Sequence, residues 1–360
     1  MVKNEEHQPT NTITIDYIKE HQQHKKLVSS ELGDLFANYL GDSLFSCVFE
    51  HHLQVVEDDE IREFIEFALA SAKKHLTSIK EIYSKENIPI PVGFGEQDVR
   101  KDAPRLFSDI FMVFYITEMS RAAFETYGSA LSTSSRHDIV DHFETGLKDT
   151  IIIYKKGMYL LLSKGMDIAP PTIPYPKKID FIDKEAFISV IAGKTRPLTA
   201  LEIKHLQVNI NTNTLGQAIM LAFSQIASSD SLRKYFREGA ELAKKQIQEL
   251  GKVLVDDDLP SPKFMSAYVS DSTVSPFSDK LLLYHTVLSN GIGIQNYGTA
   301  LSKILRHDIH LKFASLSAGI GKYVNDGTNI MVNLGLLEEP PTSADRKKLS
   351  KMSPGNTPVQ

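Results

Sequence analysis

The chain has 360 residues, of which 42% are hydrophobic and 24% are charged, and this composition supports a sizeable globular core. Its formal net charge of −5 argues against a nucleic-acid-binding surface, which needs clustered lysine and arginine. No apolar run approaches the roughly 20 residues that span a bilayer, and residues 1–12 lack the apolar core of a signal peptide. The single cysteine, Cys47, fits a reducing compartment. We therefore expect a cytoplasmic protein that does not insert into membranes.

Four helices are expected in the first half of the chain. Apolar residues recur at the three-and-four spacing of a helix face over 29–56 and again over 61–82. The second helix ends before the Ile-Pro-Ile-Pro stretch at 88–91, because each proline disfavours helix in the preceding residue. The same spacing predicts a third helix over 105–131, and a fourth helix follows it and runs to about residue 164.

A long internal repeat organises the whole chain. The motif Tyr-Gly-x-Ala-Leu-Ser, followed by Arg-His-Asp-Ile, occupies residues 127–139 and returns at 297–309, a shift of 297 − 127 = 170 positions. A repeat this long indicates two copies of one domain and not a solenoid of short units. The second copy begins near residue 198 and follows the first through its proline-rich loop and its terminal glycine.

These elements predict an all-α protein built as two tandem four-helix bundles, over residues 27–168 and 198–340. Each copy has one long connection, between its second and third helices. A single long crossover at that place is typical of ferritin-like bundles. The sequence therefore predicts two tandem ferritin-like four-helix bundles that arose by internal duplication.

The remaining segments lie outside the bundles. Residues 1–26 are polar and predict a loose N-terminal arm, and residues 341–360 predict a flexible tail. Residues 169–197 predict a linker. Because its stretch 181–191 carries too many apolar residues for a free tether, we expect this linker to dock on a bundle.

The tandem units, the Pro-x-Pro after the second helix and the Tyr-Gly-x-Ala-Leu-Ser-x-x-x-Arg-His-Asp-Ile corner together resemble a known family. It is an uncharacterised ferritin-like family of spore-forming bacteria, related to the spore coat F proteins. The resemblance spans roughly residues 27–340. It implies the ferritin-like fold and, for function, an association with spores.

A metal site inside the first bundle is the sharpest chemical hypothesis. Ferritin-like di-iron proteins place a glutamate on two helices and a Glu-x-x-His motif on the other two. Carboxylate or imidazole side chains fall on or beside the apolar stripes of all four helices here, namely Glu50, His75, Glu118, Glu125 and His142. This set predicts a site for iron or another divalent metal.

Two observations weaken that hypothesis. The glutamates expected three residues before the histidines are replaced by Ala72 and Ile139, so a di-iron centre would lack two carboxylates. The second copy carries neither carboxylate nor imidazole at the five equivalent positions, which are Leu221, Gln246, Leu288, Gln295 and Lys312. A mononuclear site in the first copy remains open, and the favoured alternative is a buried polar network in which Glu and His pair with each other.

The repeated Arg-His-Asp corner suggests a catalytic histidine oriented by an aspartate. Adjacent helical residues point about 100° apart, however, so His137 and Asp138 do not face one another. We interpret the corner as a joint in which Arg136 and His137 bond the carbonyls that end the third helix. Ser132 and Ser302 are interpreted as helix caps and not as nucleophiles, so no catalytic residue is predicted.

Two pairs of glycines lie inside the third and fourth predicted helices of the second copy, Gly291 with Gly293 and Gly319 with Gly321. Each costs a helix about 1 kcal/mol relative to alanine. Close approach of the two backbones is the expected reason, and a small cavity is the functional alternative. Cys47 is expected to be a small core residue.

Three functions remain open at this stage. The first is a non-enzymatic structural or interaction role associated with the spore coat or sporulation, with coat proteins or a second copy as partners and no cofactor. The second is a ferritin-like metal-binding protein whose site lies only in the first bundle. The third is a small-molecule-binding bundle with its pocket in either copy.

Overall fold

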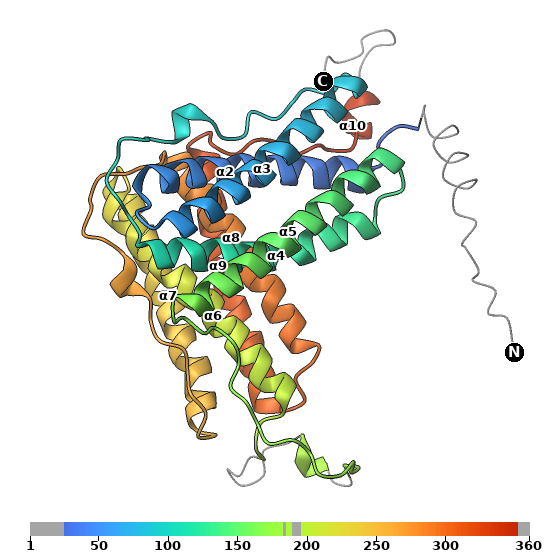
Figure 1. Cartoon of the computed structure of the whole chain (residues 1–360). Helices are drawn as coiled ribbons and strands as arrows, with labels where there is room; N and C mark the ends of the chain where they lie inside the picture. Colours follow the sequence, from blue (N-terminus) through green and yellow to red (C-terminus); the bar gives the residue numbers. More distant parts are fainter. Residues whose placement is uncertain (1–24, 183–184, 189–195, 352–360) are drawn as a thin grey trace, which may run out of the picture.

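The computed structural model describes residues 25–182, 185–188 and 196–351, and their regular structure is helical apart from two isolated β-bridges. The first unit consists of α2 (Ser29–Val55), α3 (Asp59–Glu86), α4 (Asp109–Ser132) and α5 (His137–Ser163). The second unit consists of α6 (Ala200–Ile226), α7 (Asp230–Val255), α8 (Asp279–Leu301) and α9 (His307–Asn333) (Figure 1). Short helices are η1 (Glu96–Asp98), η2 (Glu185–Phe187), η3 (Ser266–Tyr268) and α10 (Arg346–Leu349).

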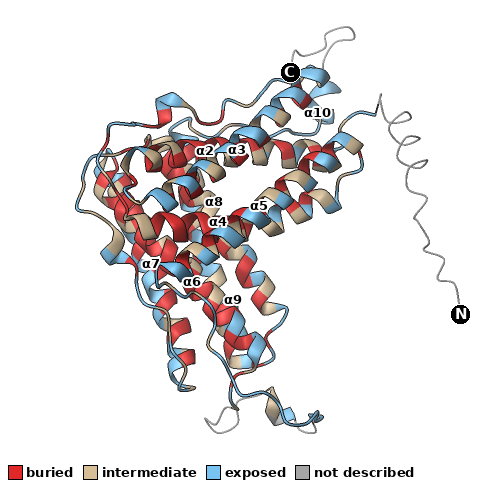
Figure 2. Cartoon of the chain, in the orientation of Figure 1, coloured by how far each residue is buried: buried red, intermediate tan, exposed pale blue. Residues whose placement is uncertain are grey.

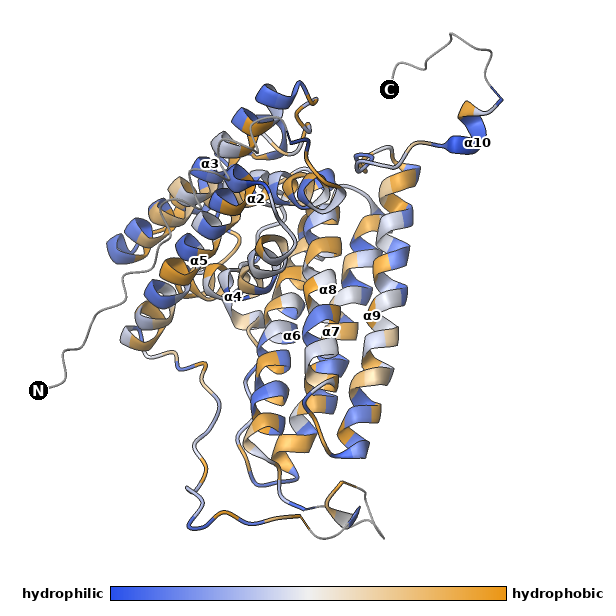
Figure 3. Ribbon diagram, turned by 90° about the vertical axis from the view of Figure 1, so that its right-hand side faces the viewer, coloured by the Kyte–Doolittle hydropathy of each residue, from blue (hydrophilic) through white to orange (hydrophobic). Residues whose placement is uncertain are grey.

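The all-α prediction is confirmed, and so is the duplication into two units of four helices. In each unit the first two helices pack against each other, as do the last two. Hydrophobic and hydrophilic stretches alternate along most of these helices (Figure 3), as expected for helices that turn one side toward a core. Across the described ranges, no helix is long and apolar enough to cross a membrane.

Two expected helix starts differ from the structure. α4 begins at Asp109 and not at Arg105, because the Ser108 side chain caps it by accepting a hydrogen bond from Phe111 N at 3.4 Å. Ser132 does not cap the fourth helix, and that prediction is wrong. It is the last residue of α4, and its hydroxyl donates to the Ser129 carbonyl at 2.8 Å.

The two units meet about a local two-fold axis. The isolated bridges join Val99 to Phe277 and Phe107 to Val269. Since 99 + 170 = 269 and 107 + 170 = 277, each bridge is the symmetry equivalent of the other. The contact between the units is therefore isologous, like that of a homodimer with two-fold symmetry. Figure 2 shows that buried segments concentrate where the units meet.

The largest hydrophobic cluster spans both units. The starts of α4 and α8 both belong to it, and Phe111, Met112, Leu281 and Leu282 are at most 1% exposed. Tyr115 of α4 stacks on His285 of α8, with ring centroids 5.6 Å apart. Smaller clusters occupy the far end of each unit. Cys47 belongs to the shared cluster and is buried, which confirms its interpretation as a core residue.

A buried glutamate ties each Arg-His-Asp corner to the start of the unit's first helix. The Glu31 carboxylate accepts hydrogen bonds from Ser135 N and Arg136 N, both at 2.8 Å, and from Val28 N at 2.9 Å. Burial opposes its ionisation, but these backbone donors outweigh burial and lower the pKa of Glu31. Glu202 repeats the arrangement in the second unit, accepting from Arg306 N at 3.0 Å.

The corner is a joint, but its contacts differ from those expected. Arg136 donates to its neighbour Asp138 at 2.8 Å and to the Lys25 carbonyl at 3.1 Å. His137 pairs with Asp141 at 2.8 Å. The side chains of Arg136 and His137 therefore bind other groups, and the prediction that they bond the carbonyls ending α4 is wrong.

The linker docks over only part of its expected length. Ile179 and Phe181 are 94% and 91% exposed, so the prediction that the apolar stretch is covered from residue 181 onward is wrong there. Near residue 188 the linker does dock, because the Ile188 carbonyl accepts a hydrogen bond from His307 N of the second unit at 3.0 Å. Of the N-terminal arm, residues 1–24 lie outside the described residues, and the tail includes the one-turn helix α10.

Three histidines are buried near the local two-fold axis. His285 Nε2 lies 2.7 Å from the Tyr115 hydroxyl, and these two residues are equivalents in the repeat (115 + 170 = 285). His51 and His52 are 1% and 2% exposed, and their ring nitrogens have no hydrogen-bond partner among the described residues. Burial lowers the pKa of His51 and His285 to about 4 and that of His52 to about 3.

We predict that the fold loses stability in mild acid because of these histidines. Their folded pKa values lie below the ordinary 6.5, so the unfolded chain binds more protons and stability falls as pH drops from about 6.5 toward 4. His52 alone should contribute a loss of about 2 kcal/mol between pH 7 and pH 5. Urea unfolding at both pH values measures the loss, and His52→Phe should reduce it, since the second unit carries Phe223 there. An equal loss of stability in His52→Phe and in the wild type would contradict the prediction that His52 contributes to it.

The glycine pairs of the second unit are not explained by close backbone approach. A Cβ at Gly291 or Gly321 would meet no atom within 4 Å, and one at Gly293 or Gly319 would make an ordinary contact at 3.7 Å. The prediction that two helix backbones approach closely at these glycines is therefore wrong. Gly327 does need to be glycine, because its Cβ would overlap the Tyr235 hydroxyl.

Alanine substitution at two glycines should change stability in opposite directions. Gly291→Ala should stabilise the protein by about 1 kcal/mol, because the helix gains propensity without a clash. Gly327→Ala should destabilise it by about 2 kcal/mol, because Tyr235 must move. Thermal or urea unfolding of the two variants beside the wild type checks this, and a destabilised Gly291→Ala would contradict it.

Candidate functional site

The structure does not bring the predicted glutamates together. Glu50 on α2 forms ion pairs with Lys73 at 2.8 Å and Lys101 at 3.5 Å. Glu118 on α4 is buried and pairs with Arg121 on the same helix at 3.0 Å. Both carboxylates thus have cationic partners. Glu125, also on α4, is half-buried.

The structure does bring the predicted histidines together. The rings of His75 on α3 and His142 on α5 lie 6.3 Å apart, edge to face. His142 contacts Asn38 Oδ1 at 2.9 Å and Ser78 Oγ at 3.0 Å. Burial, and then the neighbouring His75, lowers the pKa of His142 to about 4, so this ring is neutral near pH 7.

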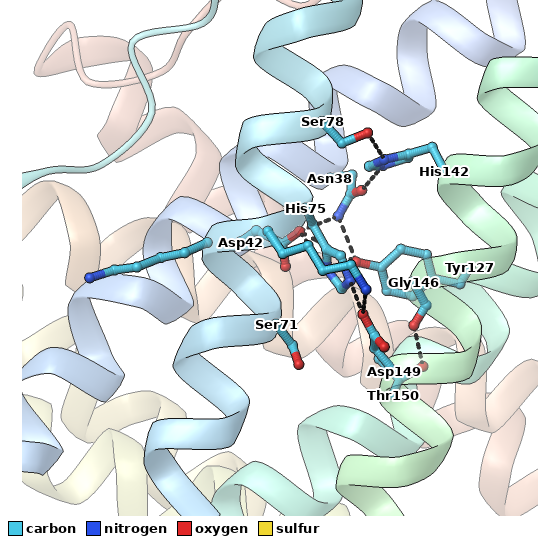
Figure 4. Close-up of polar contacts among 12 residues, drawn as sticks. Asn38, Asp42, Ser71, His75, Ser78, Tyr127, His142, Gly146, Asp149 and Thr150 are labelled. Atoms are coloured by element: carbon cyan, nitrogen blue, oxygen red, sulfur yellow. Dashed lines mark hydrogen bonds and ion pairs between the residues drawn. The ribbon is translucent and has the colours of Figure 1, made fainter.

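His75 is the centre of a charged cluster that draws on all four helices of the first unit. Its Nε2 lies 3.1 Å from the Asp149 carboxylate on α5. Its Nδ1 lies 3.0 Å from the Tyr127 hydroxyl on α4 and 3.4 Å from the Asp42 carboxylate on α2. Figure 4 shows these side chains converging, with Asn38 donating to Tyr127 at 3.0 Å.

The two carboxylates favour the charged form of His75. Burial by itself lowers the pKa of this imidazole, but Asp42 and Asp149 outweigh burial and raise it above the ordinary value. Lys74 adds a second positive charge, 2.9 Å from Asp149. The cluster therefore balances two carboxylates against an imidazolium and an ammonium.

Within the described ranges, no group of three or more His, Cys, Asp or Glu side chains is arranged to hold a metal ion. In the His75 cluster both ring nitrogens already face a carboxylate or a hydroxyl. The metal site on Glu50, His75, Glu118, Glu125 and His142 stays a prediction from the sequence. The contacts of these side chains are those of a polar network.

Sequence reasoning missed Asp42, Asp149 and Tyr127 as members of this cluster. A signal was present in the comparison of the two copies. Asp42, His75 and Asp149 become Asn213, Gln246 and Gly319 in the second unit, so all three charges are lost together. Charged positions that change as a set point to side chains that contact each other.

A glycine positions Tyr127 against the cluster. The tyrosine ring lies directly on the backbone of α5 at Gly146, where a Cβ would overlap the ring. The Tyr127 hydroxyl can therefore reach His75 from a buried position, and burial raises the pKa of Tyr127 well above its ordinary value. Tyr127 acts as a neutral hydrogen-bonding group.

A cavity of about 180 Å³ lies beside the cluster. Asn38, Asp42, His75 and Tyr127 form a polar part of its wall, and most of the remaining wall is apolar. Part of that apolar wall comes from the second unit, because Tyr284, Leu288 and Ile292 of α8 line it too. Leu288 stands at the position equivalent to Glu118, so a glutamate of one copy is replaced by a cavity-lining leucine in the other.

Removing the charge of His75 should destabilise the first unit. His75→Gln, which copies Gln246 of the second unit, leaves Asp42 and Asp149 without the imidazolium and should cost about 3 kcal/mol at pH 6. Because the pKa of His75 is raised, its contribution is complete below the ordinary value of 6.5 and is lost as pH rises through the folded value. Urea unfolding should therefore show a smaller difference between variant and wild type in alkali.

The second unit supplies a matched control for that experiment. Adding Asp42→Asn, the residue found at Asn213, should recover part of the stability lost in His75→Gln. The two substitutions should thus be non-additive in a double-mutant cycle. Additive effects would show that the Asp42–His75 contact contributes nothing.

Comparison with known proteins gives two matches. A protein-family model described as "Protein of unknown function (DUF3231)" matches residues 16–179 and, a second time, residues 186–349. A solved structure described as a "putative spore coat protein" from Bacillus halodurans C-125 is similar over 43% of this chain and 99% of its own, at 17% identity and a TM-score of 0.40. No curated protein matches the chain.

Proposed function

The chain belongs to the DUF3231 family, and we propose that it is a small-molecule-binding protein whose site is the cavity beside His75. The observation that supports this function best is the combination of apolar walls with a hydrogen-bonded charged cluster in one cavity. Ligand sites have this composition, with many apolar side chains and a few polar groups that fix orientation. We propose a binding role and not a catalytic one.

The volume and the lining limit the class of ligand. An apolar cavity of about 150 Å³ binds benzene, so about 180 Å³ fits one aromatic ring system or a short aliphatic chain. The polar wall favours a ligand with one hydrogen-bond donor, because the Asp42 carboxylate is an acceptor. A small, mostly apolar molecule with an N–H or O–H group satisfies both conditions.

The second unit is not expected to bind the same ligand. Its corresponding cavity is about 50 Å³ and is lined in part by Asn213 and Gln246, which replace Asp42 and His75. We therefore propose that the ligand site lies in the first unit.

Two glycines on α2 provide a test of the cavity. A Cβ at Gly41 or at Gly33 would meet no atom within 4 Å, but only Gly41 lines the cavity. With indole as the probe, we expect saturable binding to the wild type by NMR titration. Gly41→Leu should weaken it at least about tenfold by filling the site, and Gly33→Leu should leave it unchanged. Failure of indole to bind the wild type, or equal binding by both variants, would count against the proposal.

We also propose that each unit is ferritin-like in helix order. The long connections, between α3 and α4 and between α7 and α8, support this, together with the pairing of the first two and the last two helices. A structural or interaction role at the spore coat stays a prediction. So does the divalent metal site of the first unit.

A further inference from the structure

The long loops between α3 and α4 and between α7 and α8 occupy equivalent positions in the repeat, but they pack against the protein differently. In the first unit the loop lies against α2, where Phe94 N donates to Ser43 Oγ at 3.2 Å. Val92 N and Gly93 N donate to the Glu338 carboxylate at 2.8 and 2.7 Å. The loop is thus pinned on one side by the first helix of its own unit and on the other by the segment that follows α9.

This seating depends on Gly93. Its φ is +59°, a conformation that other residues rarely adopt. A Cβ at this position would lie 2.7 Å from Ser43 Oγ and 2.9 Å from the Tyr39 ring. Any larger residue would lift the loop from α2.

The second unit has lost each of these features. The loop at 260–268 contains no residue with positive φ, and Thr214 and Ile168 stand at the positions of Ser43 and Glu338, by shifts of 171 and 170. Phe264 of this loop is 41% exposed. In place of a seated loop, a groove of about 840 Å³ lies between the loop at 260–268, α6 and the first unit.

The floor of the groove carries unused hydrogen-bonding capacity. Thr214 is 2% exposed, and its Oγ1 has no hydrogen-bond partner among the described residues. Beside it, Gln207 and Asn211 take the places of Phe36 and Leu40, so two amide side chains line the groove where the first unit is apolar. Asn211 Nδ2 donates to the Ile168 carbonyl at 3.1 Å, and Gln207 Nε2 donates to Asn211 Oδ1 at 3.5 Å. A buried hydroxyl without a partner costs stability, and a bound donor would remove that cost.

The walls indicate a largely apolar ligand. Ile110, Phe114 and Met166 contribute apolar wall. At the rim Lys164 pairs with Asp58 at 2.6 Å, and Asp167 and Lys263 also line the groove. The volume falls within the range of about 300–1,000 Å³ that ligand sites occupy.

We propose that this groove binds an extended peptide segment, as its symmetry equivalent holds the segment 92–95 of this chain. A backbone N–H of the peptide donates to Thr214 Oγ1, as Phe94 N donates to Ser43. The second amide hydrogens of Gln207 and Asn211 and the Gln207 carbonyl oxygen pair with further peptide groups. The site is separate from the cavity beside His75, and the inference does not depend on that cavity.

A synthetic peptide provides the probe. We would use a fluorescent 8-residue peptide with the sequence of residues 88–95, Ile-Pro-Ile-Pro-Val-Gly-Phe-Gly, with blocked ends, and measure its anisotropy with the full chain. Saturable binding is expected, and a scrambled peptide of the same composition should bind much more weakly. No saturation up to about 1 mM, or equal binding of the scrambled peptide, would overturn the proposal.

Two variants place the binding in the groove. Thr214→Val should weaken binding about fivefold by removing the acceptor, and should raise the unfolding temperature because a buried unpaired hydroxyl is lost. The double variant Gln207→Phe/Asn211→Leu installs the residues of the first unit and should weaken binding at least about tenfold. Ser289→Ala, outside the groove, is the control. Peptide binding that both groove variants leave unchanged would show that it occurs elsewhere and would overturn the proposal.

Discussion

The fold depends on the burial of α4 on all sides. Every residue from Phe111 to Ser120 is buried, although a helix in a single four-helix unit should expose one face. The face that points away from the first unit packs on the second, where the start of α8 is buried in the same way. One unit alone would leave this apolar surface in water, so each copy needs the other.

This joint also explains where the sites lie. The cavity beside His75 is lined in part by three residues of α8, and the groove lies between α4 of the first unit and α6 of the second. Both spaces are therefore lined by residues of both units. Sites at the junction of two packed units are common, because two convex bundles rarely match over their whole contact.

Some features could be predicted from the sequence because they are local. The helices follow from apolar spacing, and the duplication follows from the repeated corner. What could not be predicted depends on tertiary contacts. Asp42 and Asp149 show no special spacing along their helices, and only packing brings them to His75. The partner of the corner, Glu31, is about 104 residues away from Ser135, so no local pattern could indicate it.

The sequence predicted metal binding by two glutamates that form ion pairs in the structure. Glu50 and Glu118 lie on apolar stripes, which favoured a metal site, but lysines and an arginine satisfy them. A long cationic side chain can contact a carboxylate from a neighbouring turn or helix, and the spacing of apolar residues does not predict such a contact. Apolar spacing therefore places Glu50 and Glu118 on inward stripes without indicating the cations that each of them pairs with.

The two copies differ both at the local axis and away from it. At the axis, equivalent positions carry different residues that contact each other, as Tyr115 contacts His285. Away from the axis, the two copies have changed at different places. There the first unit has the charged His75 cluster where the second has amides, and the second unit has the polar Thr214 groove where the first has a seated loop. Duplication thus produced one core that both units share. Outside that core, the first unit has acquired the charged His75 cluster and the second unit has acquired the Thr214 groove.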